Sequence, residues 1–320
     1  MRQQYFVIAA ALGMSISLPP SVRSGVQPAA AQPVNIDELW IDPVDLEQRD
    51  LYRGPSEGPG APDPGTTFTF VRRDTTGRSP GYDVRDETGH EWSVKLGIEA
   101  SAEVTSSRIL WAIGYHQPPN YFVGEWLMTG AESGPQAPGR FRPQVEGKRV
   151  IGEWKWNEGP LTGARPMKGL LVAQMMINNW DLKTSNNKLY EISDPGEGPS
   201  RMYMVRDLGA SLGSNEQAKW LRLFELRAAQ GSKNNLEDFE KSRFIDHVEG
   251  RRVVFEYSGP NKRFVSNISV DDVRWTAALM KRLSDQQWRD AFRAGGYSED
   301  ETERYVTKMK ERVDEGLAAR

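Results

Sequence analysis

The stretch of sequence that decides the fold runs Asn179-Trp180-Asp181-Leu182-Lys183-Thr184-Ser185-Asn186-Asn187, and its companion farther along the chain is Asp207-Leu208-Gly209. Asp181 and Asn186 stand five residues apart on a short polar segment that follows the apolar run 167–178. Asp207 comes twenty-six residues after Asp181, at the end of a β-rich run. Carboxylate and amide oxygens are groups that hold a hydroxyl or a hard cation such as Mg²⁺. The two segments therefore predict a site for oxygen-ligand chemistry.

The sequence upstream of this pair predicts a lysine held by a helix carboxylate. Alternating β-formers indicate an antiparallel meander of three strands, at 67–71, 82–85 and 91–96. Apolar spacing predicts a helix over 102–113. Lys95 lies in the third strand and Glu103 follows eight residues later on the helix, where it could keep the ammonium charged and aimed. Glu99 is the alternative partner, and we expect it to precede the helix.

Taken in order, these segments resemble the protein-kinase-like superfamily over roughly residues 67–213. The motifs are similar to those of atypical members, such as HipA-type, phosphoinositide, Fam20 and CotH kinases. The resemblance implies that Asp181 orients the acceptor hydroxyl and takes its proton, and that Asn186 and Asp207 hold Mg²⁺ or Mn²⁺. It further implies that Lys95 contacts the phosphates of ATP or another nucleoside triphosphate, and that Glu103 holds Lys95.

The resemblance also points to a nucleotide-covering loop between the first two strands, at residues 74–81. This loop has no G-x-G-x-x-G pattern, but the backbone amides around Thr76 and Gly77 could approach a phosphate. Asn179 and Trp180 stand where typical kinases have His-Arg, so control by a phosphorylated activation loop is not expected. No Ala-Pro-Glu segment follows Asp207. The acceptor is therefore left open: protein, lipid, sugar or small molecule.

The chain divides into regions of different composition, and together they predict an α+β, two-lobed fold. We expect a signal peptide at 1–31, an extended lead-in at 32–66, a β-rich N-lobe with one helix at 67–157, and a mostly helical C-lobe at 158–320. Residues 133–142 are interpreted as a Pro/Gly loop, and residues 157–166 as the lobe boundary. The signal peptide favours a periplasmic or secreted protein, with no membrane span after cleavage.

Within these regions the remaining elements follow from pattern. Two further strands are expected at 121–128 and 150–156, an apolar helix at 167–178, and a hairpin formed by 188–192 and 202–206. Helices in the last hundred residues begin at Ser269, Ser284 and Ser298. Each serine is followed three residues later by Asp272, Gln287 or Glu301, the pattern of a capping box.

Composition removes several classes of function. The 320 residues hold 41 basic and 44 acidic side chains, giving a formal charge of −3, so no basic excess indicates a nucleic-acid partner. The absence of cysteine excludes disulfides, thiolate zinc sites, iron–sulfur clusters and cysteine nucleophiles. With only three histidines, a multi-histidine metal centre is not expected.

Two alternatives to an active kinase stay open at this point. A kinase-like chain can be a pseudokinase, an inactive protein that only binds a partner. Residues 209–213 also match G-x-S-x-G, the nucleophile elbow of α/β-hydrolases, with Ser211 as nucleophile. In that interpretation His247 supplies the base and Asp238 or Asp246 the acid. The chain before Ser211 lacks the alternating strand–helix pattern of such a fold, which favours the kinase-like interpretation.

Overall fold

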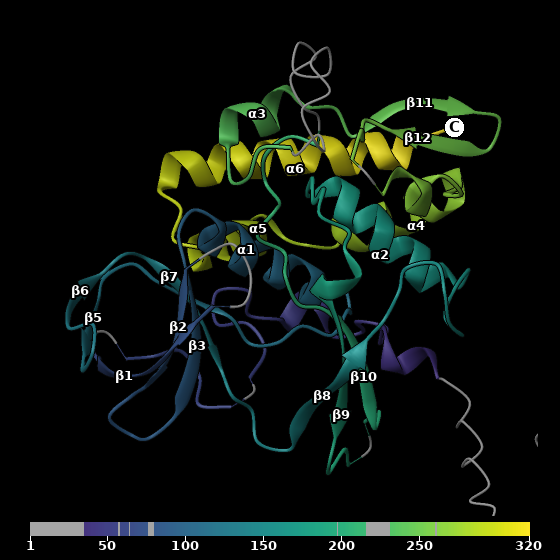
Figure 1. Cartoon of the computed structure of the whole chain (residues 1–320). Coiled ribbons are helices and arrows are strands. Elements are labelled where there is room, and N and C mark those ends of the chain that lie inside the picture. Colours follow the sequence, from purple (N-terminus) through teal and green to yellow (C-terminus); the bar gives the residue numbers. More distant parts are fainter. Residues whose placement is uncertain are drawn as a thin grey trace, which may run out of the picture. The chain divides into compact units, whose positions relative to one another are not determined.

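The computed structural model (Figure 1) describes residues 35–56, 58–63, 65–75, 80–196, 198–215, 231–259 and 261–320. The signal peptide predicted at 1–31 and the loop residues Thr76 and Gly77 lie outside the described residues. Val34–Arg320 form one compact unit, and everything below concerns that unit. A search of the described helices found none with the length and apolar character needed to cross a bilayer.

The first sheet is built largely from the N-lobe segments that the sequence indicated. In the described part of the chain its strand order is β4-β7-β3-β2-β1-β5-β6. The meander is confirmed, with antiparallel pairs β1–β2 and β2–β3. The strands are β1 (Thr67–Asp74), β2 (Gly81–Arg85), β3 (Glu91–Leu96), β4 (Tyr121–Val123), β5 (Trp126–Thr129), β6 (Gly134–Gln136) and β7 (Gly139–Pro143).

Two expectations about this sheet are corrected. The single strand expected at 121–128 is two strands, β4 and β5, which lie apart in the sheet. The Pro/Gly loop expected at 133–142 contains β6 and β7, and β7 sits between β4 and β3. Its five residues are all buried. The surrounding glycines and prolines hid a strand whose Arg140-Phe141-Arg142 core alternates in the way a strand requires.

Helix α1 (Glu99–Ala112) follows β3 directly and is buried along nearly its whole length. It begins three residues earlier than predicted, so Glu99 lies in its first turn rather than before it. Thr105 Oγ1 donates to the Ala291 carbonyl at 3.1 Å, which ties α1 to α5 (Asp285–Ala294). A helix surrounded by protein on all sides is fixed in place, and so are the side chains that it projects.

A second sheet carries the loop that opened the sequence analysis. Its order is β10-β9-β8, from β8 (Lys148–Glu153), β9 (Asn187–Ile192) and β10 (Arg201–Val205). The predicted hairpin is thus confirmed, and β8 is its third strand rather than part of the first sheet. The apolar helix is also present, as α2 (Arg165–Met176), with a proline in its first turn where no amide partner is needed.

The C-terminal part is mainly helical, and the three predicted capping boxes are all present. They begin α4 (Val270–Lys281), α5 and α6 (Glu299–Ala318). Two further elements were not predicted from sequence patterns: the hairpin of β11 (Ile245–Glu249) and β12 (Arg252–Phe255), and the short helix α3 (Leu236–Lys241). The α+β fold, with a β-rich N-terminal part carrying one helix and a mostly helical C-terminal part, is confirmed.

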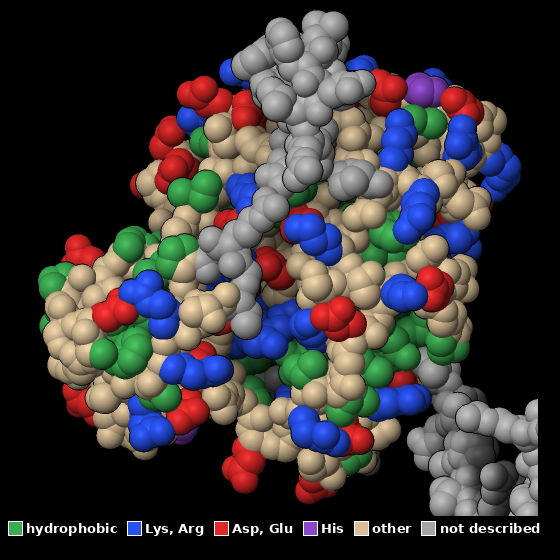
Figure 2. Space-filling view, in the orientation of Figure 1, with side chains coloured by type: hydrophobic (Ala, Val, Ile, Leu, Met, Phe, Trp, Pro, Cys, Tyr) green, Lys and Arg blue, Asp and Glu red, His purple; other side chains and the backbone are tan. Residues whose placement is uncertain are grey.

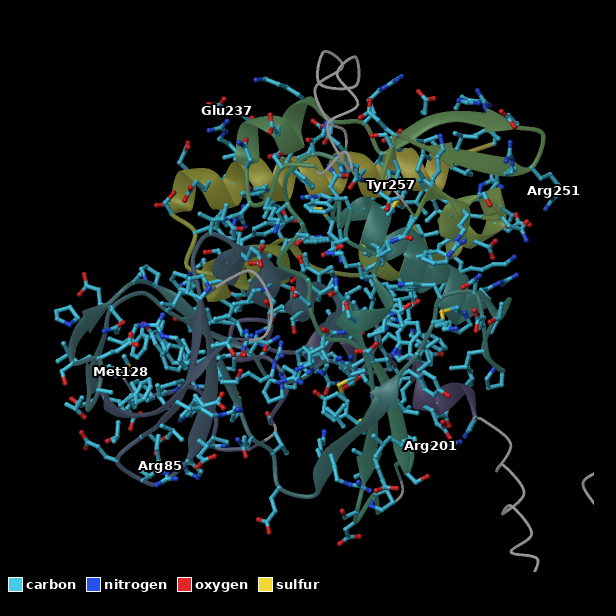
Figure 3. All side chains as sticks on the ribbon, in the orientation of Figure 1. Arg85, Met128, Arg201, Glu237, Arg251 and Tyr257 are labelled. Carbon is cyan, nitrogen blue, oxygen red and sulfur yellow. The ribbon has the colours of Figure 1, made fainter. Side chains whose placement is uncertain are left out.

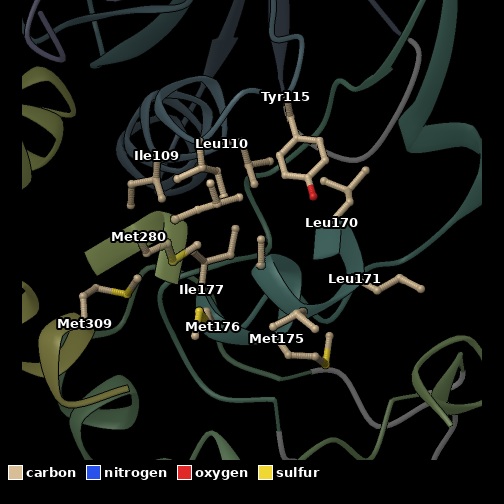
Figure 4. Packing of buried hydrophobic residues seen from close by; sticks show 14 of the residues in the cluster. Ile109, Leu110, Tyr115, Leu170, Leu171, Met175, Met176, Ile177, Met280 and Met309 are labelled. Atoms are coloured by element: carbon tan, nitrogen blue, oxygen red, sulfur yellow. The ribbon is translucent and has the colours of Figure 1, made fainter. Parts of the chain in front are cut away.

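One apolar cluster joins α1 to the helical part of the molecule (Figure 4). This cluster contains Ile109 and Leu110 of α1 together with Met175 of α2, Met280 of α4 and Met309 of α6, and all five side chains are buried. Burying a side chain of this size contributes about 1.5–3 kcal/mol. The helix that carries Glu103 is therefore anchored by the C-terminal core, and not only by its own sheet.

The lead-in segment adds polar ties to the same anchor. Trp40 Nε1 donates to the Ile113 carbonyl at the end of α1, at 2.8 Å. Glu38, in the 3₁₀ helix η1 (Ile36–Glu38), pairs with Arg201 of β10 at 3.0 Å (Figure 3). The second 3₁₀ helix, η2 (Leu46–Gln48), lies under α5, where Gln287 Nε2 donates to the Leu46 carbonyl at 2.7 Å. These contacts connect α1, β10 and α5 through one segment.

Candidate active site

The five residues predicted for phosphoryl transfer all line one pocket of about 490 Å³. They are Lys95, Glu103, Asp181, Asn186 and Asp207, and they come from β3, α1, the segment after α2 and the end of β10. Figure 2 shows basic side chains gathered in this region, between the first sheet and the β8–β10 sheet. The structure therefore brings together residues that are up to 112 positions apart in sequence.

Lys95 is the centre of the charge network in this pocket. Its Nζ lies 3.3 Å from Glu103 Oε2, 2.9 Å from Asp207 Oδ1 and 2.6 Å from Glu99 Oε2. Burial would lower the pKa of Lys95, but Glu103, Asp207 and Glu99 outweigh it and raise that pKa above its ordinary value. Both predicted partners thus bind Lys95, and the ammonium stays charged.

Glu103 is the most enclosed acid of the site, with 1 % of its surface exposed. Its Oε1 lies 2.7 Å from Arg142 Nη2 and 2.9 Å from Arg140 Nε, and Lys95 is on the other oxygen. Burial would raise the pKa of Glu103, but Arg140, Lys95 and Arg142 overcome this and hold it at about 2. The carboxylate is therefore ionised over the whole physiological range of pH.

Arg142 is the residue of the site that sequence reasoning missed. Its Nε donates to Asn120 Oδ1 at 2.8 Å, and its Nη2 donates both to Glu103 and to the Arg206 carbonyl, the latter at 2.9 Å. It thus links α1 to the residue just before Asp207. The alternation of Arg140-Phe141-Arg142 was the signal that could have revealed it, but the interpretation of 133–142 as a loop removed both arginines from consideration.

Asp181 and Asn186 are coupled through the backbone of their own loop. Asn186 ends the 3₁₀ helix η3 (Thr184–Asn186), and its Nδ2 donates to the Asp181 carbonyl at 2.7 Å. With the amide nitrogen engaged, the oxygen Oδ1 is the atom of Asn186 suited to a cation. Asp181 Oδ2 pairs with Lys183 Nζ at 2.8 Å. The carboxylate therefore already has a cation beside it, two residues farther along.

The loop is held from beneath by buried polar groups of the C-terminal part. Asn178 has φ 52, in the left-handed region that asparagine tolerates better than most residues. Arg312 of α6 donates to Asn178 Oδ1 and to the Met176 carbonyl, each at 2.8 Å. Tyr257, labelled in Figure 3, donates to the Trp180 carbonyl at 2.9 Å. These bonds fix the backbone on both sides of Asn179.

Strand pairing brings Arg206, the residue before Asp207, opposite Asn186. The β9–β10 register continues one step beyond the strands, where the Arg206 amide donates to the Asn186 carbonyl at 2.8 Å. Gly209 follows in close contact with α1, since a Cβ at this position would be 2.7 Å from Glu99 Cβ. No larger residue fits there without displacing Glu99. The Asp-Leu-Gly turn is therefore a packing requirement as well as a site for Asp207.

The donor set fits a hard cation that brings further ligands of its own. Asp207 offers a carboxylate and Asn186 an amide oxygen, the ligand types that Mg²⁺ prefers. Among the described residues, no cluster of three or more His, Cys, Asp or Glu could hold a metal ion. A cation at this place would need phosphate and water oxygens to complete its coordination, which is the usual situation for Mg²⁺ in phosphoryl-transfer sites.

The charges of the pocket favour an anionic ligand. Among the described lining residues, seven are basic and five are acidic, whereas the whole chain is acidic by three charges. The basic set extends beyond the predicted residues, and its members are Lys95, Arg140, Arg142, Lys183, Lys188, Arg206 and Lys233. A cleft with a local excess of one sign concentrates ligands of the opposite sign.

The structure gives no support to a serine hydrolase. Ser211 is fully buried, with its Oγ donating to the Leu208 carbonyl at 2.6 Å and 2.7 Å from Ser106 Oγ. His247 lies exposed on β11, where its ring nitrogens pair with Asp246 and Glu249. A nucleophile elbow must expose its serine to a histidine base, and neither condition is met here.

Comparisons with known proteins include a distant structural likeness. No protein-family model matches the chain, and no curated protein matches its sequence. The crystal structure of a Helicobacter pylori proinflammatory kinase, CtkA, is similar to it with a TM-score of 0.43 and 12% identity. The match covers 79% of this chain and 97% of that chain. A likeness at this level assigns no family, so the function is argued from the residues of the pocket.

Proposed function

We propose that this protein is a kinase-like phosphotransferase that moves a phosphoryl group from a nucleoside triphosphate to an acceptor hydroxyl. The observation that carries the proposal is the position of Lys95. Its ammonium lies between Glu103 and Asp207, in a basic pocket that Asp181 and Asn186 also line. Transfer of a phosphoryl group needs positioning and charge stabilisation more than covalent chemistry, and these residues supply both.

Each residue would have a separate task. Lys95, kept charged by Glu103, would bind phosphate oxygens. Asp181 would hold the acceptor hydroxyl and take its proton as the new bond to phosphorus forms. Asp207 and Asn186 would hold Mg²⁺ or Mn²⁺, which, when bound, neutralises phosphate charge. Lys183, already paired with Asp181, would stand next to the transferring group.

The contact between Lys95 and Asp207 has a consequence for binding order. Asp207 has 46 % of its side chain exposed, so it can turn away from Lys95 at little cost. The same carboxylate cannot hold a cation fully while it neutralises the lysine. Nucleotide phosphates would take over Lys95, and Asp207 would then be free for the metal. We therefore expect nucleotide and metal to bind together, each weakly without the other.

The test measures nucleotide binding and turnover on the full chain. Thermal unfolding is recorded with ATP, with Mg²⁺ or Mn²⁺, and with both, and ADP release is assayed in parallel. We expect stabilisation only with both components, and an Asp181→Asn variant that keeps this stabilisation but loses turnover by about 10²–10⁴-fold. Asp300→Asn, which changes an exposed acid on α6, is the control and should match the wild type.

The same experiment separates a pseudokinase from an enzyme. Three carboxylates pair with Lys95. If these pairs persist when nucleotide is bound, Lys95 does not contact the phosphates, and this favours a protein that binds nucleotide without transferring its phosphoryl group. Stabilisation by ATP and metal together with ADP release no faster than that of Asp181→Asn would establish the pseudokinase. The absence of any stabilisation would overturn the proposal altogether.

A further inference from the structure

A second pocket, away from the Lys95 residues, encloses about 660 Å³. Its walls are residues 52–56 and 58–62 of the lead-in segment, β4, the turn between α5 and α6, and Arg108 of α1. None of the five predicted phosphotransfer residues lines it. A volume of 300–1,000 Å³ is typical of small-molecule sites. The walls are largely apolar, and Tyr52, Tyr121 and Phe122 contribute aromatic rings.

The unusual feature of this pocket is the charge of Arg108. The side chain is 1 % exposed, and its one hydrogen bond to the described residues runs from Nη2 to the Asn120 carbonyl, at 2.7 Å. Nε and Nη1 are buried, and neither has a hydrogen-bond partner among the described residues. Burial lowers the pKa of Arg108 to about 10, and the charges of Tyr121 and Asp50 offset only part of this effect. A buried charge without a counter-ion is costly, and proteins seldom keep one without a use.

The other charges around the pocket leave Arg108 as the group that needs an anion. Arg293 pairs with Asp290 at 3.1 Å and lies over the Tyr52 ring. Arg53 is largely exposed and is 3.7 Å from Asp50. Among the described residues that line the pocket there is no acid at all. One unmatched positive charge in an apolar enclosure fits a ligand with one negative charge.

The chain is shaped to leave Arg108 beside this space. Gly54 packs directly on the guanidinium, with φ 77, and any Cβ at that position would overlap Cζ. The Tyr121 ring faces the same group, with its centroid 5.4 Å from Cζ. Glycine is thus required where the lead-in crosses Arg108. Shielding by these groups from bulk water strengthens the attraction of the guanidinium for an anion in the pocket.

A run of buried hydrogen bonds leads from this pocket to the active-site candidate. Asn120 accepts from Arg108 with its carbonyl and from Arg142 with Oδ1. Arg142 in turn donates to Glu103, which binds Lys95. Arg108 and Glu103 also share the helix α1. An anion that binds Arg108 therefore changes the surroundings of Asn120, the residue that also accepts a hydrogen bond from Arg142.

We propose that the pocket beside Arg108 binds a small organic carboxylate with an apolar body, and that its occupancy alters nucleotide affinity through Asn120 and Arg142. The binding site itself is independent of the phosphotransferase proposal, whereas the effect on nucleotide rests on it. A carboxylate supplies one charge to the guanidinium, and its hydrocarbon part fills the aromatic walls.

The site is tested on the full chain by thermal unfolding with matched pairs of probes. These are benzoate with neutral benzamide, and octanoate with neutral octanamide. We expect at least one carboxylate to raise the unfolding temperature saturably, while its amide does not. Arg108→Met should weaken carboxylate binding, measured as the fitted Kd, at least tenfold, and Arg251→Met, which changes an exposed arginine outside the pocket, should leave it unchanged.

A second variant keeps the test decisive if Arg108→Met folds poorly. Val123→Trp on β4 fills the pocket with Arg108 intact and should also abolish the carboxylate shift. Glu57 lies outside the described residues, and Glu57→Gln is measured alongside. The proposal is overturned if a carboxylate and its amide raise the unfolding temperature equally, or if either pocket variant keeps the full shift in unfolding temperature. It is also overturned if Glu57→Gln alone lowers the unfolding temperature and tightens carboxylate binding, because the chain would then supply its own anion.

The effect on nucleotide is measured as the Kd of ATP with Mg²⁺, with and without saturating carboxylate. Coupling between sites requires reciprocity, so the change in nucleotide affinity, at least fivefold, must equal the change in carboxylate affinity caused by nucleotide. Carboxylate binding with unchanged nucleotide affinity would overturn the coupling and leave the site. Carboxylate binding without any nucleotide binding would overturn the phosphotransferase proposal and the coupling with it.

Discussion

Two buried arginines, Arg142 and Arg108, share Asn120 as a hydrogen-bond partner but differ in their other partners. Arg142 donates to Asn120 Oδ1 and also to Glu103 and the Arg206 carbonyl. Arg108 donates to the Asn120 carbonyl, and in the described part of the chain its other two nitrogens have no hydrogen-bond partner. Burial lowers the pKa of each, to about 9 for Arg142, where Arg140 and Arg206 add to the effect, and to about 10 for Arg108. Only one of them has an acid of its own.

The difference indicates two uses of a buried cation. In the first pocket the charges of Arg142 and Arg140 are met by Glu103, although Arg140 Nε makes no hydrogen bond to the described residues, and this Glu103 network fixes Lys95 before any ligand arrives. In the second pocket the charge of Arg108 is left for a ligand to meet. Networks with every member satisfied give rigidity, whereas an unsatisfied buried group is a place where binding gains free energy.

Removing the carboxylate of Glu103 should break the Glu103 network and have the largest effect on the free energy of unfolding. Glu103→Gln leaves Arg140 and Arg142 buried without their countercharge, while Lys95 keeps Glu99 and Asp207, and breaking a buried pair in this way costs about 3–5 kcal/mol. We expect the free energy of unfolding in urea to fall by that amount. Glu47→Gln, an exposed acid of η2, should change it by less than about 0.5 kcal/mol. Equal stability of Glu103→Gln and wild type would mean that the network carries no stability.

The two arginines themselves give the next largest contrast. Arg142→Met removes a partner from Glu103 and should cost about 3 kcal/mol. Arg108→Met loses one hydrogen bond but also an unmatched buried charge, so its cost should stay below about 1 kcal/mol. Chemical denaturation of both variants measures the contrast. The comparison is contradicted if Arg108→Met lowers the free energy of unfolding more than Arg142→Met does.

Lowering the pH should weaken the Glu103 network and reduce the difference in stability between the wild type and Glu103→Gln. The pKa of Glu103 in the fold is about 2, below its ordinary value of 4.5. The stability from its ionised form is therefore fully present above pH 4.5 and is lost as the pH falls towards 2. We expect the difference between wild type and Glu103→Gln to shrink across this range in urea titrations. A difference that stays constant down to pH 2.5 would contradict the assignment.

A capping change sets the scale of an ordinary local effect. Ser298 begins α6, and its hydroxyl accepts from the Glu301 amide at 3.3 Å. Ser298→Ala should cost about 1 kcal/mol, as N-cap losses generally do. It should leave carboxylate and nucleotide binding unchanged, since α6 lines neither pocket. A change in either affinity would show that the binding assays respond to stability alone.

The sequence predicted those parts of the fold that depend on local pattern. The meander, α2, the β9–β10 hairpin and the three capping boxes follow from periodicity and capping chemistry. Asp181, Asn186 and Asp207 could be predicted because a short loop and a strand end fix their order. The structure brings them to one pocket with Lys95 and Glu103, while their chemical roles stay predictions.

What could not be predicted depends on contacts between distant segments. Strand β7 is flanked by glycine and proline and is short, so local pattern favoured a loop, although its neighbours in the sheet bury all of it. Arg142 and Arg108 have ordinary sequence surroundings, and only the fold shows which one meets an acid. Glu99, in the first turn of α1, packs against Gly209 and pairs with Lys95, and local sequence pattern shows neither of these contacts.

The central claim is that Lys95, Asp207 and Asn186 form a site for a metal–nucleotide complex, and one measurement tests it most directly. Thermal unfolding of the full chain is followed with ATP at a hundredfold excess over its Kd, with and without Mg²⁺, for wild type and Asp207→Ala. We predict stabilisation of about 2.7 kcal/mol for the wild type with both ligands, and its loss without Mg²⁺ or without Asp207. Stabilisation that is the same in Asp207→Ala, or that needs no metal, would contradict the account.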